Sequence, residues 1–354
     1  MARVTDAEAD GTTGFSPVSR GPIIALVLDR VPTFHQETCY DNLGMNPWIG
    51  SSSPLNTIGK RIRYARREGE RVDTCYWYLT HNRAIMAHML PSEYQRFAIH
   101  MAKNAGEMMQ HHFSRGMRRL WTTNAEPVRE TDLAINRRVI ERVHETFLGH
   151  DILAEQESDL SYKSEYIWVC DPIDGTIPFS HGIPTCVFSL ALTCNGESIL
   201  GVVYDPFLDR MFFAEKGGGA FLNGQKISVS KETTLKNNVI CSEHWRGWIY
   251  DLSNVAQVLD ERGSILLKPC SITYMASLVA TGDCLATIFP GAHPHDTAAV
   301  KVIIEEAGGK VTDLDGNEQR YDQPIKGHIA SNGIIHDELL EIVRANMKEQ
   351  TFQS

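Results

Sequence analysis

The chain has 354 residues, of which 42% are hydrophobic and 22% charged, a composition ordinary for a globular protein in water. Its formal net charge of −10 argues against a nucleic-acid partner, because a phosphate backbone binds basic surfaces. The eight cysteines include no Cys-x-x-Cys pair, which excludes a zinc ribbon and fits a reducing compartment without a disulfide framework. The first ten residues lack a signal-peptide core and the apolar run 23–28 is too short to cross a bilayer, so we expect a cytoplasmic protein without a membrane partner.

Residues 1–90 differ in character from the rest of the chain. Ser, Gly, Pro and Asn interrupt them throughout, and no long amphipathic period emerges. Six basic residues from Lys60 to Arg71 are compatible with an anion-binding surface, but we prefer a solvated or partly disordered segment. We therefore expect a loop-rich extension over 1–90 and a catalytic domain over 91–348.

Two helices are predicted at the start of this domain. Ser92-Glu93-Tyr94-Gln95 has the form of a capping box, and Glu130-Thr131-Asp132 opens the second helix. Buried positions are expected at helical spacing, namely Phe97, Met101, Ala105, Met108 and His112, then Ile135, Val139, Val143 and Phe147. Asp132 has two interpretations, as a favourable charge on the helix dipole or as a functional carboxylate.

Acidic residues follow two successive apolar segments. Glu155 comes directly after the segment 151–154, and Asp171 directly after the strand predicted over 167–170. If the two strands pair, these carboxylates lie side by side.

The segment Asp171-Pro172-Ile173-Asp174-Gly175-Thr176 has two interpretations. Its two carboxylates are oxygen ligands that hard cations prefer, and the amides after Gly175 would form an anion site if a helix begins there. A cation site beside an anion site indicates metal-assisted chemistry on a phosphate. The alternative is a Pro-Asp-Gly turn that only joins two elements.

The next part of the chain predicts mainly strands, over 185–194, 199–204, 210–215 and 219–222, with a hairpin turn at Asn223-Gly224. The glycines at 217–219 lack the lysine of a Walker loop and the spacing of a dinucleotide fingerprint. No Gly-x-Ser-x-Gly motif occurs, which argues against a serine hydrolase.

The remaining elements are predicted as strands over 238–242 and 263–268 around a helix over 248–260, a helix over 275–281 and a strand over 284–289. Asp296 is expected to cap a helix that contains Val300, Ile303, Ile304 and Ala307. A transition-metal site made by His293, His295 and Asp296 is a second interpretation, which we disfavour because Pro294 stiffens the spacing.

Taken together, these motifs resemble the inositol monophosphatase family of magnesium-dependent, lithium-sensitive phosphatases. The resemblance runs from about Glu93 to Val343 and rests on motifs that occur in the family's order: Glu130-Thr131-Asp132, Leu153-Ala154-Glu155, Asp171 to Thr176, Gly219 to Gly224, Asp296 to Ala299 and Glu306 to Gly309. It implies an α/β (α+β) fold, the layered α-β-α-β-α sandwich that fructose-1,6-bisphosphatase shares, and a homodimer.

The resemblance also implies roles for individual residues. The Mg²⁺ ligands would be Glu155, Asp171, the carbonyl of Ile173, Asp174 and Asp296. Glu155, Thr176 and Asp132 would be the catalytic residues, with Thr176 beside the attacking water and Asp132 holding a further metal or its waters. The substrate would contact Asp174, Gly175, Thr176, Phe289 and Asp296, and its phosphate oxygens would bind the Gly175 and Thr176 amides.

Three positions depart from the family pattern. Gln156 stands where the family commonly has an acid, and His295 stands where a tryptophan usually precedes the last metal aspartate. Phe289 replaces an acid that receives a ring hydroxyl in members that act on inositol. The extension over 1–90 has no counterpart in a typical member, so Met86 or Met89 is a candidate start of translation.

We therefore expect a Mg²⁺-dependent phosphomonoesterase that hydrolyses inositol 1-phosphate or a similar small ester by metal-activated water. Histidinol phosphate, a nucleotide 3′-phosphate and fructose 1,6-bisphosphate are alternative substrates, because Phe289 cannot accept a hydrogen bond from an inositol hydroxyl. The alternative from another functional class is a non-catalytic regulatory protein with the same fold.

Overall fold

The computed structural model describes residues 92–113, 126–155, 163–243 and 248–350. The expectations for residues 1–90, including the basic run from Lys60 to Arg71, and for Gln156 lie outside the described residues. Among the described helices, none is long and apolar enough to span a membrane.

A seven-stranded sheet forms the first β layer, and its strands lie side by side in chain order. β1 and β2 are parallel, and every later pair in this sheet is antiparallel. The strands are β1 Asp151–Ala154, β2 Tyr166–Asp174, β3 Val187–Cys194, β4 Glu197–Asp205, β5 Arg210–Glu215, β6 Gly219–Leu222 and β7 Gln225–Lys226. The predicted Asn223-Gly224 turn joins β6 to β7, and both residues have the positive φ that this turn requires.

A five-stranded sheet forms the second β layer, in the order β10-β8-β11-β13-β12. Its first three strands are parallel, whereas β13 is antiparallel to both of its neighbours. The strands are β8 Val239–Ser242, β10 Ile265–Leu267, β11 Ala286–Phe289, β12 Lys310–Thr312 and β13 His328–Ser331. Two short strands, β9 Tyr250–Asp251 and β14 Lys348–Glu349, make a separate antiparallel pair.

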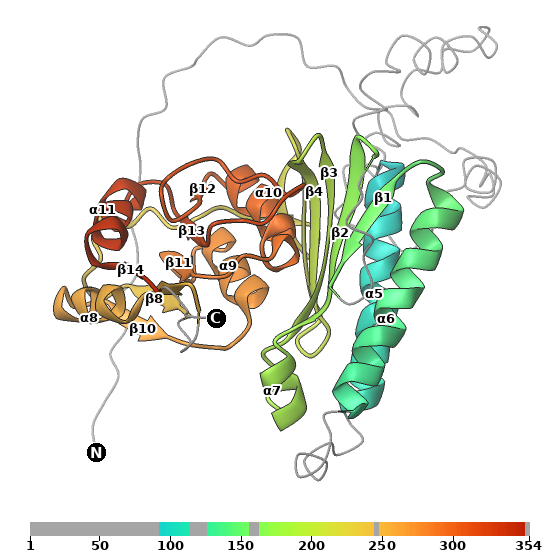
Figure 1. Ribbon diagram of the computed structural model, residues 1–354, viewed down its shortest axis with the longest axis horizontal. Coiled ribbons are helices and arrows are strands. Elements are labelled where there is room, and N and C mark those ends of the chain that lie inside the picture. The colour runs from blue at the N-terminus through green and yellow to red at the C-terminus, as the bar shows by residue number, and fades with distance from the viewer. Residues whose placement is uncertain (1–91, 114–125, 156–162, 244–247, 351–354) are drawn as a thin grey trace, which may run out of the picture. The chain divides into compact units, whose positions relative to one another are not determined.

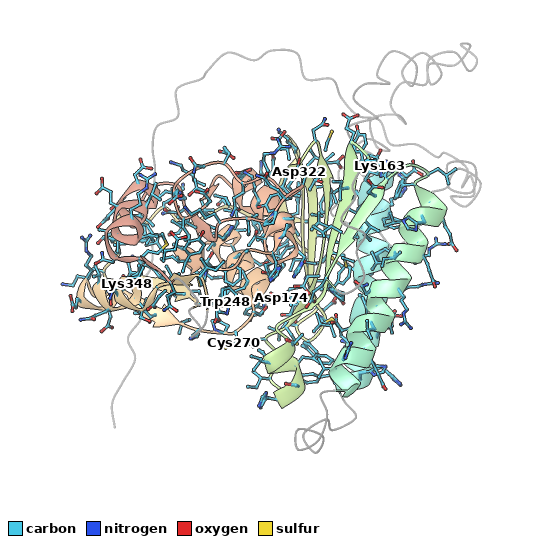
Figure 2. All side chains as sticks on the ribbon, viewed as in Figure 1. Lys163, Asp174, Trp248, Cys270, Asp322 and Lys348 are labelled. Atoms are coloured by element: carbon cyan, nitrogen blue, oxygen red, sulfur yellow. The ribbon has the colours of Figure 1, made fainter. Side chains whose placement is uncertain are left out.

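Three pairs of helices alternate with the two sheets (Figure 1). The pairs are α5 Glu93–Phe113 with α6 Glu126–Thr146, α9 Ile272–Ala280 with α10 Ala298–Glu306, and α8 Ser253–Glu261 with α11 His336–Asn346. The first pair covers the outer face of the seven-stranded sheet, the second lies between the sheets, and the third covers the far face of the five-stranded sheet. Three clusters of buried apolar side chains fill the interfaces, so the expected α-β-α-β-α sandwich is confirmed (Figure 2).

The two outer helices form for the predicted reasons, although their boundaries differ. The Ser92 hydroxyl accepts a hydrogen bond from the Gln95 amide at 2.9 Å, which caps α5. Met109, rather than Met108, is fully buried on the apolar stripe of α5. Helix α6 begins at Glu126, one turn earlier than expected, so Asp132 lies in its second turn. The interpretation of Asp132 as a charge at the start of the helix is therefore wrong.

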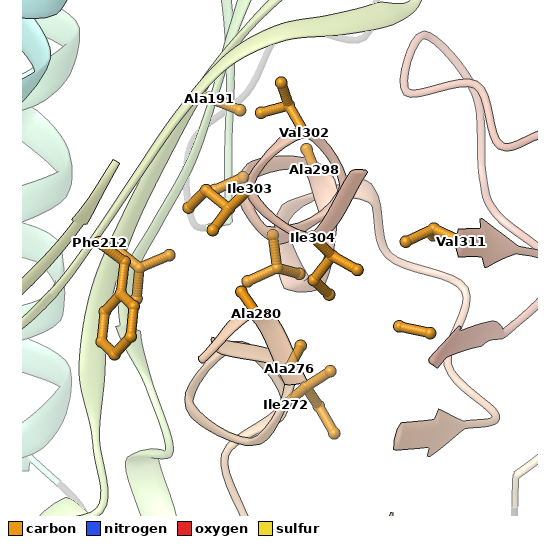
Figure 3. Close-up of a cluster of buried hydrophobic side chains, with 14 of the residues drawn as sticks. Ala191, Phe212, Ile272, Ala276, Ala280, Ala298, Val302, Ile303, Ile304 and Val311 are labelled. Atoms are coloured by element: carbon orange, nitrogen blue, oxygen red, sulfur yellow. The ribbon is translucent and has the colours of Figure 1, made fainter. Parts of the chain in front are cut away.

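The central core joins the seven-stranded sheet to α9 and α10 (Figure 3). Small side chains such as Ala276, Ala298 and Ala299 let these helices approach the sheet closely. On β4, a Cβ at Gly201 would lie 2.2 Å from the Ala299 carbonyl oxygen, so glycine is needed there. This close approach fixes where α10, and the residues just before it, lie against the sheet.

Two helix starts in this central layer also differ from expectation. Helix α9 begins at Ile272, three residues earlier than predicted, and Ser271 is its N-cap. Helix α10 begins at Ala298 with Thr297 as its N-cap, so the expectation that Asp296 caps this helix is wrong. Asp296 instead ends a short 3₁₀ turn, η2 Pro294–Asp296, which leaves its carboxylate available for other contacts.

Candidate active site

A bulge at the end of β2 turns two aspartates toward the same side of the sheet. Side chains alternate along a regular strand, so residues three apart, such as Asp171 and Asp174, would face opposite sides. The pairing of β2 with β3 shifts register between these two residues. Cys170 and Ile173 accordingly both lie in the outer core, while Asp171 and Asp174 both face the central layer.

The parallel pairing of β1 with β2 brings a third carboxylate to the same place. Ala154 lies opposite Cys170 in the register, so Glu155 and Asp171 are the next residues of two neighbouring strands. The conditional expectation that these carboxylates lie side by side is therefore confirmed. Glu155 is partly exposed, whereas Asp171 is only 3% exposed.

The fourth carboxylate comes from the turn before α10. Asp296 follows Pro294 and His295 in η2, and its backbone carbonyl accepts a hydrogen bond from the Thr273 hydroxyl at 2.9 Å. Helix α9 thus helps to position η2 against the end of β2.

Two groups of side chains at this point are arranged to hold a cation. In the first, Asp171, Asp174 and Asp296 each offer a carboxylate oxygen, and the three oxygens lie within 4.8 Å of one another. In the second, Glu155, Asp171 and His295 offer ligand atoms within the same distance. Asp171 belongs to both groups.

The electrostatics of the carboxylates also fit a cation. Burial raises the pKa of Asp171 well above its usual value, and the charges of Glu155, Asp174 and Asp296 raise that pKa further. Burial, then the charges of Asp174 and Glu155, likewise raise the pKa of Asp296. A dication among these groups would favour their ionised forms. The all-oxygen donor set therefore fits Mg²⁺, which prefers carboxylate ligands.

Asp174 is held by the beginning of α9. The Ser271 hydroxyl and the Thr273 amide donate to its Oδ2, each at 2.6 Å, and the Ile272 amide donates to its Oδ1 at 3.2 Å. Burial raises the pKa of Asp174, and these hydrogen bonds oppose that rise because they favour the carboxylate.

Sequence reasoning missed Ser271 and Thr273. The usable signal was a serine immediately before an apolar helical stretch, which is a common N-cap pattern.

Gly175 and Thr176 begin the short helix α7, Thr176–His181. Gly175 has a φ of 91°, and a Cβ there would lie 2.9 Å from both the Ser271 Cβ and the Thr185 carbonyl oxygen. Glycine is therefore required for conformation and for space. Thr176 is exposed, and its amide lies in the first turn of α7, where a helix provides no acceptor.

Asp132 and Ile173 lie close to this centre. Asp132 is 3% exposed on α6, and its charge contributes to the raised pKa of Asp171. The Ile173 side chain lies in the outer core, while its amide donates to Asp171 Oδ1 at 3.1 Å.

Phe289 lies in the core at the end of β11. Its side chain is 2% exposed and packs edge-on against Trp248, with ring centroids 5.1 Å apart. Trp248 is the more exposed member of this pair. Figure 2 labels Asp174 near the start of α9 together with Trp248 and Cys270. Any effect of Phe289 on a ligand would therefore pass through its neighbours.

His295, in contrast to His293, belongs to a group that can hold a cation. The two imidazole rings stack with centroids 5.2 Å apart and an interplanar angle of 12°. Burial, with the neighbouring His293, lowers the pKa of His295 to about 4. The disfavoured grouping of His293, His295 and Asp296 thus differs from the groups observed, which pair His295 with Glu155 and Asp171.

Comparisons with known proteins agree with this geometry. The model of the inositol monophosphatase family matches residues 90–348. A fructose-1,6-bisphosphatase/inositol-1-monophosphatase of Thermotoga maritima is 32% identical over 260 residues, which cover 72% of this chain and 96% of the relative. Inositol monophosphatase 1 of Mus musculus is 29% identical over 254 residues, which cover 67% of this chain and 89% of the relative.

Solved structures give the same result. An inositol monophosphatase structure from Thermotoga maritima has a TM-score of 0.63 at 31% identity and covers 72% of this chain and 98% of its own. The inositol monophosphatase of Anabaena has a TM-score of 0.64 at 28% identity, with 72% and 96% covered. The chain therefore belongs to the inositol monophosphatase family, whose members are phosphoric monoester hydrolases.

Proposed function

We propose that this phosphatase depends on Mg²⁺ and hydrolyses a small phosphate monoester, with inositol 1-phosphate as the first candidate. The observation that carries the proposal is the convergence of three carboxylates, from Asp171, Asp174 and Asp296, within 4.8 Å. Two of these acids, Asp171 and Asp174, are buried and Asp296 is partly buried. Without a role in binding a cation they would oppose folding, because their charges repel and are poorly solvated.

In this proposal Glu155, Asp171, the Ile173 carbonyl, Asp174 and Asp296 hold the metal, and Asp132 holds a further ion or its waters. Once bound, Mg²⁺ would lower the pKa of water and neutralise charge on the leaving oxygen.

The chain's own groups would bind and orient the reactants. Glu155, which is partly exposed, and Thr176, which is exposed, would orient the attacking water. The amides of Gly175 and Thr176 would bind phosphate oxygens, and the rigid turn at Gly175 would keep them aimed at the metal. Asp174 and Asp296 would act on the ester by holding the metal beside it.

The alcohol is the least constrained part of the proposal. Phe289 lies in the core and brings no polar group to the position where members that act on inositol carry an acid, which leaves histidinol phosphate and a nucleotide 3′-phosphate as alternatives to inositol 1-phosphate. One comparison supports fructose 1,6-bisphosphate as a further candidate substrate, because the Thermotoga relative is named for both fructose-1,6-bisphosphatase and inositol-1-monophosphatase activity.

Rates with these four esters at equal concentration, with Mg²⁺ and with a chelator, would rank them. If none of the four esters were hydrolysed, the result would favour the non-catalytic regulatory alternative.

We also propose a cytoplasmic homodimer that lithium inhibits, with residues 91–348 as its catalytic domain. Membership of the family supports the homodimer and the lithium sensitivity, which gel filtration and inhibition by Li⁺ test directly.

Asp174→Asn is the sharpest test of the mechanism. The amide removes one negative charge and places a donor opposite the Ser271 hydroxyl and the α9 amides. Loss of several kcal/mol of charge stabilisation predicts a fall in kcat of at least about a hundredfold. Circular dichroism and thermal unfolding should show a folded protein. A folded variant with near-native activity would disprove the assignment.

A further inference from the structure

The two cation-binding groups differ in their donor atoms. Asp171, Asp174 and Asp296 supply oxygen only, whereas the group of Glu155, Asp171 and His295 supplies two oxygens and one imidazole nitrogen. We propose that His295 is a metal ligand and that the second group is a mixed nitrogen–oxygen site for a first-row transition-metal dication, with Mn²⁺, Co²⁺ or Zn²⁺ preferred over Mg²⁺. The inference rests on the metal centre of the proposed function and concerns which ion occupies each part of it.

The spacing of the ligand atoms suits a single ion. A cation bonded at about 2.1 Å holds two ligand atoms at most about 4.2 Å apart. The three ligand atoms already lie within 4.8 Å of one another, so small side-chain rotations close the site.

The position of His295 is restrained from several directions. Pro294 begins η2, which fixes the backbone just before His295. The His293 ring stacks on the His295 ring at 5.2 Å, and the side chain of His295 is only 12% exposed. A partly buried and stacked imidazole loses little rotamer freedom when it binds an ion.

The neighbouring carboxylate of Asp296 does not form a hydrogen bond with the His295 imidazole. Its Nε2 lies 3.8 Å from Asp296 Oδ1, which is too long for a hydrogen bond. Asp296 therefore does not prevent His295 Nε2 from coordinating a metal ion.

The donor chemistry separates the two groups. Mg²⁺ binds oxygen and keeps several of its waters, whereas imidazole nitrogen suits zinc, cobalt and related transition metals. Asp171 belongs to both groups, so one carboxylate would be shared by a Mg²⁺ and a transition-metal ion. Two ions about 3.5–4 Å apart are common in phosphate-cleaving centres.

Mn²⁺ binding to the full chain tests this inference without an activity assay. Metal-free protein is titrated with Mn²⁺ in the presence of excess Mg²⁺, with free Mn²⁺ measured by electron paramagnetic resonance. Pulsed resonance then detects ¹⁴N coupling to the bound ion. We expect one tightly bound Mn²⁺ with imidazole coupling. Absence of nitrogen coupling in the wild-type protein would overturn the proposal, whatever the variants do.

Two substitutions then assign the nitrogen. His295→Gln should abolish the coupling and weaken Mn²⁺ binding at least about tenfold, while Mg²⁺ binding at the all-oxygen group changes little. His293→Phe is the matched control, since it keeps an aromatic ring stacked on His295 but removes the other imidazole. Coupling that survives in His295→Gln, or disappears only in His293→Phe, would contradict the assignment.

Failure of this inference is distinguishable from failure of the proposed function. Hydrolysis with Mg²⁺ alone, together with no nitrogen coupling, would leave the phosphatase intact and remove the mixed site. Nitrogen coupling without hydrolysis of any ester, with any metal, would keep the site and remove the proposed activity.

Discussion

Asp174 accepts hydrogen bonds from one hydroxyl and three backbone amides, all from the beginning of α9. This arrangement fixes the rotamer of a proposed metal ligand and compensates part of the cost of its burial. Thr273 also donates its hydroxyl to the Asp296 carbonyl, so one helix end positions two of the three clustered aspartates. Ser271 and Thr273 therefore act as positioning residues.

Ser271→Ala tests this role. The substitution removes the 2.6 Å hydrogen bond to Asp174 and the N-cap of α9, so we expect Mg²⁺ affinity to fall about 10- to 100-fold. Isothermal calorimetry measures the affinity, and Ser271→Thr should restore most of it.

Ser277→Ala is the matched control on the same helix. Its hydroxyl donates to the Thr273 carbonyl at 2.8 Å and contacts no carboxylate. Equal loss of Mg²⁺ affinity in both alanine variants would show that Ser271 acts only through helix stability.

Gly175→Ala separates the requirement for conformation from the requirement for space. Gly175 and Gly182 both have positive φ, 91° and 69°, but only a Cβ at Gly175 meets other atoms. Gly182→Ala should cost about 1–2 kcal/mol of unfolding free energy from backbone strain alone. Gly175→Ala should cost about 1–3 kcal/mol more and should also reduce kcat, because Ser271 must move. Chemical denaturation of both variants measures the difference, and equal losses would refute the steric argument.

At the scale of elements, the sequence predicted most strands and helices but not the features that orient the side chains of the site residues. The order of the motifs along the chain was sufficient to predict the family and the layered sandwich fold. The bulge in β2 was not predictable, because it depends on how β3 pairs with the strand and not on β2 alone. Asp132 was placed near a helix start because the second helix was predicted to open at Glu130, whereas α6 begins at Glu126 and Val128 already packs in the outer core.

The start of α11 predicts a dependence of stability on pH. His336 is fully buried between the hydroxyls of Thr312 and Ser331, and burial lowers its pKa to about 4. Its neutral form is thus favoured by folding, while the unfolded chain takes up a proton near pH 6.5. Stability should be retained above pH 6.5 and fall as the pH drops from 6.5 toward 4, by up to about 3 kcal/mol.

Denaturant titrations of wild type and His336→Asn at several pH values measure this effect. The variant should be less stable at pH 7 but should lose less stability on acidification. His144→Asn, on the exposed face of α6, is the control and should follow the wild-type profile. Parallel curves for wild type and His336→Asn would contradict the assignment to His336.

At the scale of the whole molecule, every proposed ligand lies between Asp132 and Asp296. A chain that begins at Met89 should therefore keep Mg²⁺-dependent hydrolysis within about twofold of the full chain, since catalysis follows from the positioned groups. Steady-state kinetics on both proteins measure this, with unfolding curves as the control for folding. A shortened chain that folds fully but has lost all activity would refute the proposed domain division.

The bond between Asp174 and Ser271 joins positions 97 residues apart, and Asp296 lies further along the chain still. A ribosome therefore releases β2, with its two aspartates, long before the helix end that holds Asp174 or the last carboxylate exists. During that interval Asp296 is not yet present, so the group of three carboxylates that could hold a cation is incomplete. A metal ion consequently stabilises only the finished product of translation, because a ligand shifts folding toward the state that binds it. An interrupted polypeptide gains no such protection and stays exposed to proteases.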